Sequence, residues 1–433
     1  MRSLLSTKEQ RQLRLLEILI QKRDWIRLNE LAQTLECTER ILKNDLNELR
    51  TAFPTFKIQS SINGIMINLD TGASIEDIYI YFLSHSQSFQ LLEYMFFNEG
   101  LPIYRTVEKL HSSNANLYRL GNRITTILSK QFQIELSFTP TSLNGNEIDI
   151  RYFYAQYFSE RYYFLDWPFP DISEKVITEF ADYFYKSTNY PMRFAIYRMY
   201  KLMLAISIHR VKNGHFIDLP NHFYQDYYPV LMNLPDFEDK LAYFSQQFGL
   251  EMTPDIVAQI FISFLQNDIF LDPQQFFDSL NKNDESRYSY QLLSQILERL
   301  SKAFNIKFAN HDELIWHLHN TAYFERQETF STPLLFEQKR ITLEKFKVYF
   351  PDFMESARQE LAQYRQAIGQ HDYPEQLEHL IYTLFTHAEN ITTQLLANRP
   401  PIKVLIISNF DHALSLTLMD MLSYYCNCLL YTS

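Results

Sequence analysis

Glycine is scarce in this chain, with 8 glycines among 433 residues, about a quarter of the usual share of ~7%. The two closest, Gly64 and Gly72, are eight positions apart. Loops of the G-x-G-x-x-G and G-x-x-x-x-G-K-[ST] types need closely spaced glycines, because these let backbone N–H groups approach a phosphate. The sequence therefore excludes an enzyme built on a glycine-rich nucleotide loop.

Cysteine is also rare, with three residues, Cys37, Cys426 and Cys428. They cannot form a disulfide framework, and no C-x-x-C motif is present for zinc or redox chemistry. Cys426-x-Cys428 has no nearby histidine or cysteine to complete a metal site. No serine or cysteine lies in a recognisable nucleophile motif, so we expect no catalytic residues, no metal and no cofactor.

Long apolar runs are absent too. None approaches the ~18 residues that a membrane-spanning helix needs. The N-terminal residues Met-Arg-Ser-Leu-Leu-Ser-Thr-Lys become charged too early for a secretory signal. We therefore expect a cytoplasmic protein that has no membrane partner.

The charge that is present is distributed unevenly. The whole chain carries −11, but residues 1–57 carry +3 and residues 101–131 carry +4, whereas residues 58–100 carry −5 and residues 132–433 carry −13. DNA phosphates respond to charge within a Debye length of ~8–10 Å, so two basic islands are compatible with DNA binding by an acidic protein. A charge run alone is more often a solvated helix face.

The first basic island has the pattern of a winged helix-turn-helix domain over residues 1–72. Apolar spacing predicts two helices, and Thr38 is a good N-cap for a third that runs to about Arg50. A β-hairpin closed by Asn63-Gly64 should follow. On the third helix, the residues expected to face the core are Ile41, Leu42, Leu46 and Leu49. Its outer face offers groups that hydrogen-bond to bases and phosphates, namely Thr38, Arg40, Lys43, Asn44, Asn47 and Arg50.

Residues 86–155 repeat this order. Helices are predicted over 89–97 and from Pro102, and Ser113 or Asn114 should cap a third helix that runs to about Lys130. Segments 133–138 and 147–151 predict a hairpin closed by Asn144-Gly145. The outward residues of the third helix are Asn114, Asn116, Tyr118, Arg119, Asn122 and Arg123. Two such units in tandem, each with a basic third helix, favour binding to double-stranded DNA.

The rest of the chain is predicted to be helical. Pro, Asp and Asn breaks and the polar stretch 281–287 predict two helical bundles, residues 165–280 and 285–398, before a last segment, 401–433. The predicted fold class is therefore mainly α. Tandem winged helix-turn-helix domains precede two helical regulatory domains and a partial α/β unit at the C-terminus.

Three segments carry a resemblance to a known family, and the first is Thr38–Arg50 after Leu28–Leu35. Asn-Leu-Tyr-Arg-Leu-Gly-Asn-Arg at 116–123 and Leu-Asn-Gly-Asn-Glu-Ile-Asp-Ile-Arg-Tyr-Phe at 143–153 are similar to the Mga/RofA-like family of virulence regulators of streptococci and related Gram-positive cocci. The resemblance covers nearly the whole chain. It implies two winged helix-turn-helix domains, two regulatory (PRD) domains of the kind modified by the sugar phosphotransferase system, and a terminal module like the IIB component of that system.

The resemblance also implies a function. The protein is expected to be a transcriptional activator of virulence and surface-protein genes that forms a homodimer or a higher homo-oligomer. A phosphodonor protein of the phosphotransferase system is expected to modify it. Two other interpretations stay open: a regulator of a sugar-utilisation operon, and a helical phosphotransfer or scaffold protein that does not bind DNA.

Two histidines become phosphorylation candidates through the resemblance. Residues 204–214 match the characteristic helix of the first regulatory domain and contain His209, although Met203 replaces the histidine that related sugar-operon regulators place just before this stretch. Residues 314–320 match the second domain, with His317 at the histidine position. A structural role is the alternative for each.

The C-terminal segment resembles the first βα unit of a IIB fold. A strand at 402–408 precedes a helix over about 412–425. Ser408 and Asn409 stand where a IIB enzyme has its phospho-accepting cysteine, so catalysis is not expected. One strand and one helix cannot complete a parallel sheet, and we expect a shortened or altered C-terminus, with residues 426–433 foreign to the family, that impairs self-association.

Overall fold

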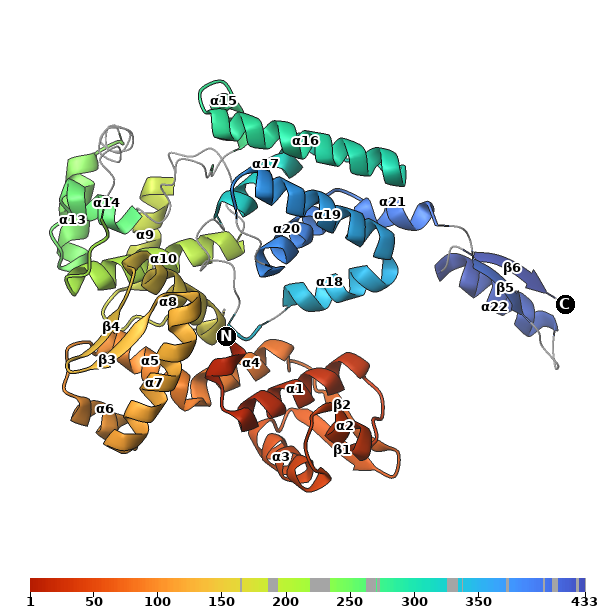
Figure 1. Ribbon diagram of the computed structural model, residues 1–433, viewed down its shortest axis with the longest axis horizontal. Coiled ribbons are helices and arrows are strands. Elements are labelled where there is room, and N and C mark those ends of the chain that lie inside the picture. The colour runs from red at the N-terminus through yellow and green to blue at the C-terminus, as the bar shows by residue number, and fades with distance from the viewer. Residues whose placement is uncertain are drawn as a thin grey trace. The chain divides into compact units, whose positions relative to one another are not determined.

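The computed structural model describes residues 1–163, 166–185, 194–218, 234–261, 270, 273–324, 334–336, 338–370, 374–399, 402–406, 412–425 and 428–432. These residues are mostly helical (Figure 1), which confirms the predicted mainly α fold class. The chain divides into unit 1, residues 1–266 and 327–337, and unit 2, residues 267–326 and 338–433. Among the described helices, none combines the length and the apolar composition that crossing a membrane requires.

The first winged helix-turn-helix domain begins unit 1. Its elements are η1 (Arg2–Leu4), α1 (Thr7–Lys22), α2 (Leu28–Thr34), α3 (Glu39–Ala52) and the antiparallel wing strands β1 (Phe56–Ser61) and β2 (Gly64–Leu69). Ser6 and Glu9 form a capping box at the start of α1. The Thr38 hydroxyl accepts a hydrogen bond from the Ile41 N–H at 3.3 Å and caps α3. These caps satisfy N–H groups that have no partner within the helix.

Gly64 is fixed by a close approach of two backbones. Ser61 pairs with Gly64, so residues 62–63 form the wing turn, one position earlier than the predicted Asn63-Gly64 turn. Ile26 and Ile65 exchange two backbone hydrogen bonds of 2.9 and 2.8 Å. Gly64 has a φ of +126°, and a Cβ atom there would lie 2.1 Å from the carbonyl oxygen of Ile26. Only glycine fits this position.

The second winged domain follows α4 (Ile75–His85). It consists of α5 (Gln87–Phe97), α6 (Ile103–Lys109), α7 (Asn114–Gln131), β3 (Glu135–Phe138), β4 (Thr141–Asn144) and α8 (Glu147–Tyr162). The prediction of a strand over 147–151 is wrong, because these residues begin α8, and residues 139–140 form the wing turn. Alternating apolar and polar residues imitate a strand here, but the Asn146 side chain caps a helix by accepting the Ile148 N–H at 2.9 Å.

The described helices that follow the second winged domain complete the helical part of unit 1. They are α9 (Glu174–Tyr185), α10 (Phe194–Lys212), α13 (Phe237–Phe248) and α14 (Pro254–Phe261). Helix α8 packs against α4 and α10, and α10 packs against α9 and α14. A single apolar core runs from Leu4 through Phe96 and Tyr154 to Leu204 and Val257. The two winged domains and this helical region therefore share one core.

A short piece of chain from much later in the sequence also belongs to unit 1. Leu334, Leu335 and Phe336 donate their backbone N–H groups to the carboxylate of Glu160 on α8, at 2.7, 2.9 and 3.2 Å. The carbonyl of Leu335 accepts a hydrogen bond from Arg2 at 3.0 Å. We call residues 334–336 the closing segment, because they cover the buried Glu160 side chain.

Unit 2 is a helical bundle followed by a small α/β part. Its helices are α15 (Pro273–Ser279), α16 (Asp284–Phe304), α17 (His311–Phe324), α18 (Gln338–Tyr349), α19 (Pro351–Ala367), α20 (Pro374–His387) and α21 (Ile391–Ala397). Helix α17 packs against α16 and α20, and α19 packs against the same two helices. Inside the bundle, the Ser289 hydroxyl lies 2.8 Å from Nδ1 of His319 and 2.7 Å from the Tyr364 hydroxyl.

The C-terminal segment is a parallel β-α-β unit. Strand β5 (Ile402–Ile406) and strand β6 (Cys428–Thr432) flank α22 (His412–Tyr425), and the strands pair in register from Ile402↔Cys428 to Ile406↔Thr432. The prediction of one strand and one helix is therefore wrong, because residues 428–432 supply the second strand. Ser408 and Asn409 lie outside the described residues.

Candidate nucleic-acid interface

Helix α3 presents a polar face to solvent. Leu42, Leu46 and Leu49 are buried, as expected, but Ile41 is 38% exposed and does not face inward. It lies at the edge of the polar face instead. The exposed candidates on or next to α3 are Thr38, Arg40, Lys43, Asn44 and Asn47, and Arg50 is half-buried.

A buried carboxylate holds α3 on α1. Asp45 accepts hydrogen bonds from Nε of Arg11 at 2.6 Å and from Nε2 of Gln12 at 3.2 Å. The bond to Asp45 also raises the pKa of Arg11. Because Asp45 points inward, Arg40 and Lys43 remain on the opposite, solvent-facing side of the helix.

Arg50 joins α3 to the wing. Its Nε atom donates to the carbonyl oxygen of Ile58 at 3.0 Å, and its Nη1 atom donates to Oδ1 of Asn47 at 3.1 Å. A third hydrogen bond goes to the hydroxyl of Ser60. These bonds set the position of β1 beside α3.

Helix α7 is the equivalent helix of the second domain. Exposed on it are Asn114, Tyr118, Arg119 and Asn122, and Asn116 is half-buried. Ser113, one of the two predicted caps, accepts the Asn116 N–H at 3.2 Å. Arg119 donates to Oδ1 of Asn116 at 2.9 Å. The Tyr118 ring packs edge-on against Phe138 of the wing, with 5.2 Å between ring centres.

Arg123 faces the first winged domain rather than solvent. Its Nη2 atom donates to the carbonyl oxygens of Ser3, Leu4 and Leu5, at 3.1 Å for Ser3 and 2.8 Å for Leu5. These carbonyls end η1, where the backbone carries partial negative charge. The structure therefore gives Arg123 a contact that joins the two winged domains.

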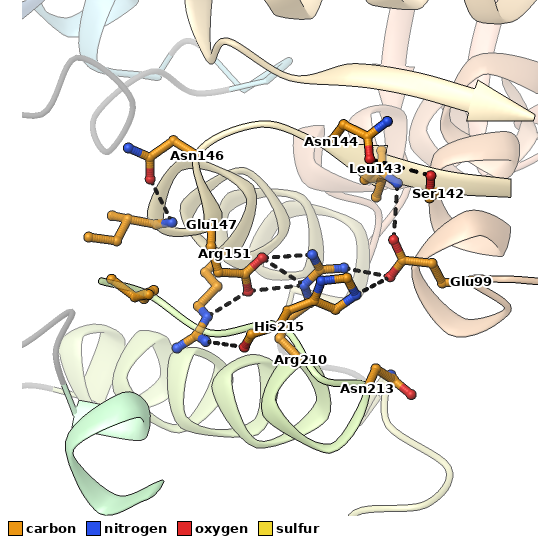
Figure 2. A network of polar contacts seen from close by, with 12 residues as sticks. Glu99, Ser142, Leu143, Asn144, Asn146, Glu147, Arg151, Arg210, Asn213 and His215 are labelled. Atoms are coloured by element: carbon orange, nitrogen blue, oxygen red, sulfur yellow. Dashed lines mark hydrogen bonds and ion pairs between the residues drawn. The ribbon is translucent and has the colours of Figure 1, made fainter. Parts of the chain in front are cut away.

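A buried charge network lies where the second wing meets α10 (Figure 2). Arg210 of α10 is 1% exposed and donates to Glu147 at 2.7 Å and to Glu99 at 2.8 Å. Arg151 also pairs with Glu147, at 2.9 Å, and Nε2 of His215 lies 2.8 Å from Glu99. Burying such charges costs several kcal/mol per ion unless partners replace water. Here, carboxylates and guanidinium groups provide those partners for one another.

The network reaches the backbone on both sides. Glu99 accepts the N–H of Leu143 in β4 at 3.1 Å. Arg151 donates to the carbonyl oxygens of Gln259 at 2.6 Å and His215 at 3.2 Å. The wing is therefore bonded to α10 through Glu99. The sequence did not predict this site, because Glu147 and Arg151 form an i,i+4 pair only if the segment is helical, and a strand was expected there.

His209 lies next to this network on α10. Its Nε2 atom is 3.1 Å from the carbonyl oxygen of Phe96, and its ring stacks on the Phe96 ring at 4.5 Å. Burial lowers the pKa of His209, and the Phe96 carbonyl opposes that shift. A phosphoryl group on Nε2 would have to replace the contact with Phe96.

His317 is closer to the surface of its bundle than its neighbour His319. The His317 side chain is 14% exposed, and its Nε2 atom lies 3.7 Å from a carboxylate oxygen of Glu313. Its ring is 4.1 Å from that of His387, between ring centres. His319 is buried against Ser289. The two histidines therefore point in different directions, as their i,i+2 spacing on a helix requires.

These domains define a class of protein. Two winged helix-turn-helix domains in one unit, each with exposed basic and amide side chains on its third helix, form a DNA-binding regulator. Three domain models of one family match most of the chain: the M protein trans-acting positive regulator (MGA) HTH domain over residues 6–65, the Mga helix-turn-helix domain over 71–158, and the MGA PRD domain over 173–391. The chain belongs to the Mga family of transcriptional regulators, as the resemblance implied.

Individual relatives agree with this assignment. A Streptococcus pneumoniae protein named as a trans-acting regulator is 39% identical over 428 residues, which cover 99% of this chain and 87% of the relative. The capsule synthesis positive regulator AcpB of Bacillus anthracis is 21% identical over 376 residues, 82% of this chain and 76% of AcpB. The anthrax toxin expression trans-acting positive regulator of the same species is 25% identical over 215 residues, 48% of this chain and 44% of the relative.

The two arginines of α7 should differ in their effect on stability. Arg123→Ala removes hydrogen bonds from three carbonyl groups, so we expect a loss of about 1–3 kcal/mol in the free energy of unfolding. Arg119→Ala changes an exposed side chain and should cost less than about 0.5 kcal/mol. Urea denaturation of the two variants and the parent protein measures both values. Equal stability of the variants would contradict the joining role of Arg123.

The charge network should make stability depend on acidity. Burial raises the pKa of Glu99, but the His215 hydrogen bond, the Arg210 charge and the Leu143 N–H lower it more, so the pKa lies below its ordinary value of 4.5. Such a carboxyl contributes stability above its unfolded pKa and loses that contribution as pH falls through the folded pKa.

We therefore expect the urea midpoint to fall as the pH drops below about 4.5, and to fall less in Glu99→Gln. Denaturation at pH 7, 5, 4 and 3.5 tests this, with Glu30→Gln as a control at an exposed carboxylate. An identical pH dependence in Glu99→Gln and the parent protein would exclude this role of Glu99.

Proposed function

We propose that this protein activates the transcription of virulence and surface-protein genes by binding their promoters through both winged domains. Helices α3 and α7 enter the major groove, and the wings approach the adjacent minor groove. The names of the capsule and toxin regulators among its relatives support positive control and this class of genes.

The observation that carries the proposal is the pair of exposed polar faces on α3 and α7. Arg40 and Lys43 make no hydrogen bond or ion pair with other described residues, which leaves their charges available to phosphates. Arginine and asparagine also match the edges of guanine and adenine. We propose that the residues that contact DNA are Arg40, Lys43, Asn44, Asn114, Tyr118, Arg119 and Asn122. The residues that cap the two helices or hold them in position are Thr38, Asn47, Arg50, Asn116 and Arg123.

For regulation, we propose that a phosphodonor of the phosphotransferase system modifies His317, within a second regulatory domain of residues 285–398. Phosphorylation replaces a neutral or singly positive group by about −2 charges. The carboxylate of Glu313, 3.7 Å away, would repel that charge and change how α17 packs. His209, in the first regulatory domain of residues 165–280, is the second candidate. Changes in these bundles would act on a homodimer or a higher oligomer.

Binding to labelled promoter fragments across a salt series tests the DNA proposal. Each phosphate contact that is lost should reduce the slope of log K against log salt by about 1. We expect the double variant Arg40→Ala/Lys43→Ala to bind more weakly than the parent protein, with a slope that is shallower by about 2. For Arg119→Ala we expect weaker binding with a slope that is shallower by about 1.

The control is Lys175→Ala, which changes an exposed lysine on α9 outside both recognition helices. It should bind like the parent protein. If the parent protein fails to bind at low salt, or if every variant binds equally, the DNA proposal is wrong and a phosphotransfer or scaffold role is favoured.

A promoter reporter tests the regulatory proposal. His317→Asp introduces a negative charge in place of that of a phosphorylated histidine, whereas His317→Ala removes the acceptor, so we expect the two variants to give different promoter activities. His311→Ala, at the start of the same helix, is the control. Mass spectrometry after incubation with a phosphorylated carrier protein should find phosphohistidine in residues 311–324. Unchanged reporter activity in both His317 variants would rule out this site.

A further inference from the structure

A cavity of about 500 Å³ lies in the second winged domain. Its walls come from the end of α4, from α5, from the end of α6 with the turn that follows it, and from the last turn of α8. The rings of Tyr94 and Phe97 and the side chain of Leu110 supply apolar surface. A cavity of this volume falls within the range of small-molecule sites, roughly 300–1,000 Å³.

Basic groups dominate the charge of this cavity. Lys109, His111 and Arg161 line it, and their side chains form no hydrogen bond or ion pair with the described residues. The guanidinium group of Arg161 lies over the ring of Tyr162, 4.9 Å from the ring centre. The Nε atom of Arg161 is buried and has no hydrogen-bond partner. A buried donor without a partner costs free energy, which a bound acceptor would recover.

One acidic residue, Glu93, also lines the cavity, but its carboxylate is already engaged. It accepts hydrogen bonds from the hydroxyl groups of Tyr157 and Tyr162. Its negative charge is therefore shared with two donors, and it forms no ion pair with Arg161 among the described residues. The ammonium group of Lys109, the guanidinium group of Arg161 and the imidazole of His111 remain available to a ligand.

The polar residues between these groups suit hydroxyl or base substituents. Gln90 donates its amide N–H to the carbonyl of Ser84 at 2.8 Å, and Asn98 donates to the carbonyl of Tyr94 at 3.0 Å. The amide oxygens of Gln90 and Asn98 accept no hydrogen bond from the described residues. They are acceptors for a ligand that carries hydroxyl or amino groups.

We propose that this cavity binds a small organic phosphate, with its phosphate monoester on Lys109, His111 and Arg161 and its organic part against Tyr94 and Phe97. Guanidinium and ammonium groups together favour a dianionic phosphate over a single carboxylate. An inorganic phosphate would leave most of the volume unfilled, so the organic part contributes to binding.

Ligand binding also acts on the helix-turn-helix itself. Lys109 ends α6, and His111 lies in the turn between α6 and α7, where it has a φ of +47°. A phosphate held by these residues and by Arg161 ties the turn to α8 and so sets the position of α7. This second half of the inference rests on the proposed DNA binding by α7, whereas the binding of the ligand does not.

Isothermal titration calorimetry on the full chain tests the site. The ligands are glucose 6-phosphate, phosphoenolpyruvate and AMP, compared with glucose, adenosine and inorganic phosphate. We expect at least one organic phosphate to bind at least tenfold more tightly than inorganic phosphate and than its own unphosphorylated form. Lys109→Gln/Arg161→Gln should weaken this binding at least tenfold.

The matched control is Arg105→Gln, an exposed arginine on the same helix whose guanidinium lies 3.7 Å from Glu108. It should bind the ligand within twofold of the parent protein. Arg161→Lys serves as a second variant, with intermediate affinity, if the double variant fails to fold. The site is overturned if no organic phosphate binds, if the unphosphorylated forms bind equally well, or if the double variant binds like the parent protein.

Promoter binding in the presence of the ligand distinguishes binding of the ligand in the cavity from its proposed effect on α7. A ligand-dependent change of at least threefold in promoter affinity, absent in the double variant, supports the effect on α7. Ligand binding with unchanged promoter affinity overturns that effect. If the double variant loses promoter binding and no organic phosphate binds the parent protein, the basic residues serve DNA phosphates. The cavity proposal then fails while the DNA proposal stands.

Discussion

Two buried guanidinium groups, Arg151 and Arg210, constrain the packing of unit 1. Each would be strongly destabilising if it lost its partners, because the interior cannot replace the water that a charge gives up. The partners are Glu99 and Glu147, which follow α5 and begin α8. Helix α10 can satisfy both carboxylates only in one position against the second winged domain. A displacement of α10 must therefore either break these ion pairs or carry the wing with it.

The same helix connects a candidate regulatory residue with the DNA-facing part. His209 and Arg210 are neighbours on α10, and they contact Phe96 and Glu99 at the end of α5. Arg123 in turn fastens α7 to η1 of the first winged domain. Helices α3 and α7 therefore belong to one body, and under the proposed DNA binding the distance between the two DNA segments that they would contact is fixed by packing rather than by a linker.

Local signals in the sequence were enough to predict the recognition helices. Thr38 and Ser113 cap them as expected, and the apolar spacing identified their buried sides, with Ile41 as the exception. The strand predicted at 147–151 shows the limit of this approach, because a period of two can also occur in the first turns of a buried helix. The role of Arg123 was beyond prediction, since the carbonyls that it meets lie about 120 positions earlier. The pairing of Glu99 with Arg210, 111 positions apart, leaves no local pattern either.

The closing segment determines when unit 1 can be completed during synthesis. Proteins emerge from the ribosome N-terminus first. The tandem winged domains and Glu160 are therefore made well before residues 334–336, since Leu334 lies 174 positions after Glu160. In that interval the Glu160 carboxylate lacks its three amide donors. In nascent chains, and in products of premature termination before residue 334, unit 1 therefore lacks the hydrogen bonds of the closing segment. We expect proteases to cleave such chains more easily. Unit 1 therefore gains the hydrogen bonds of the closing segment only after α15, α16 and α17 have been made, because these helices precede residue 334 in the chain.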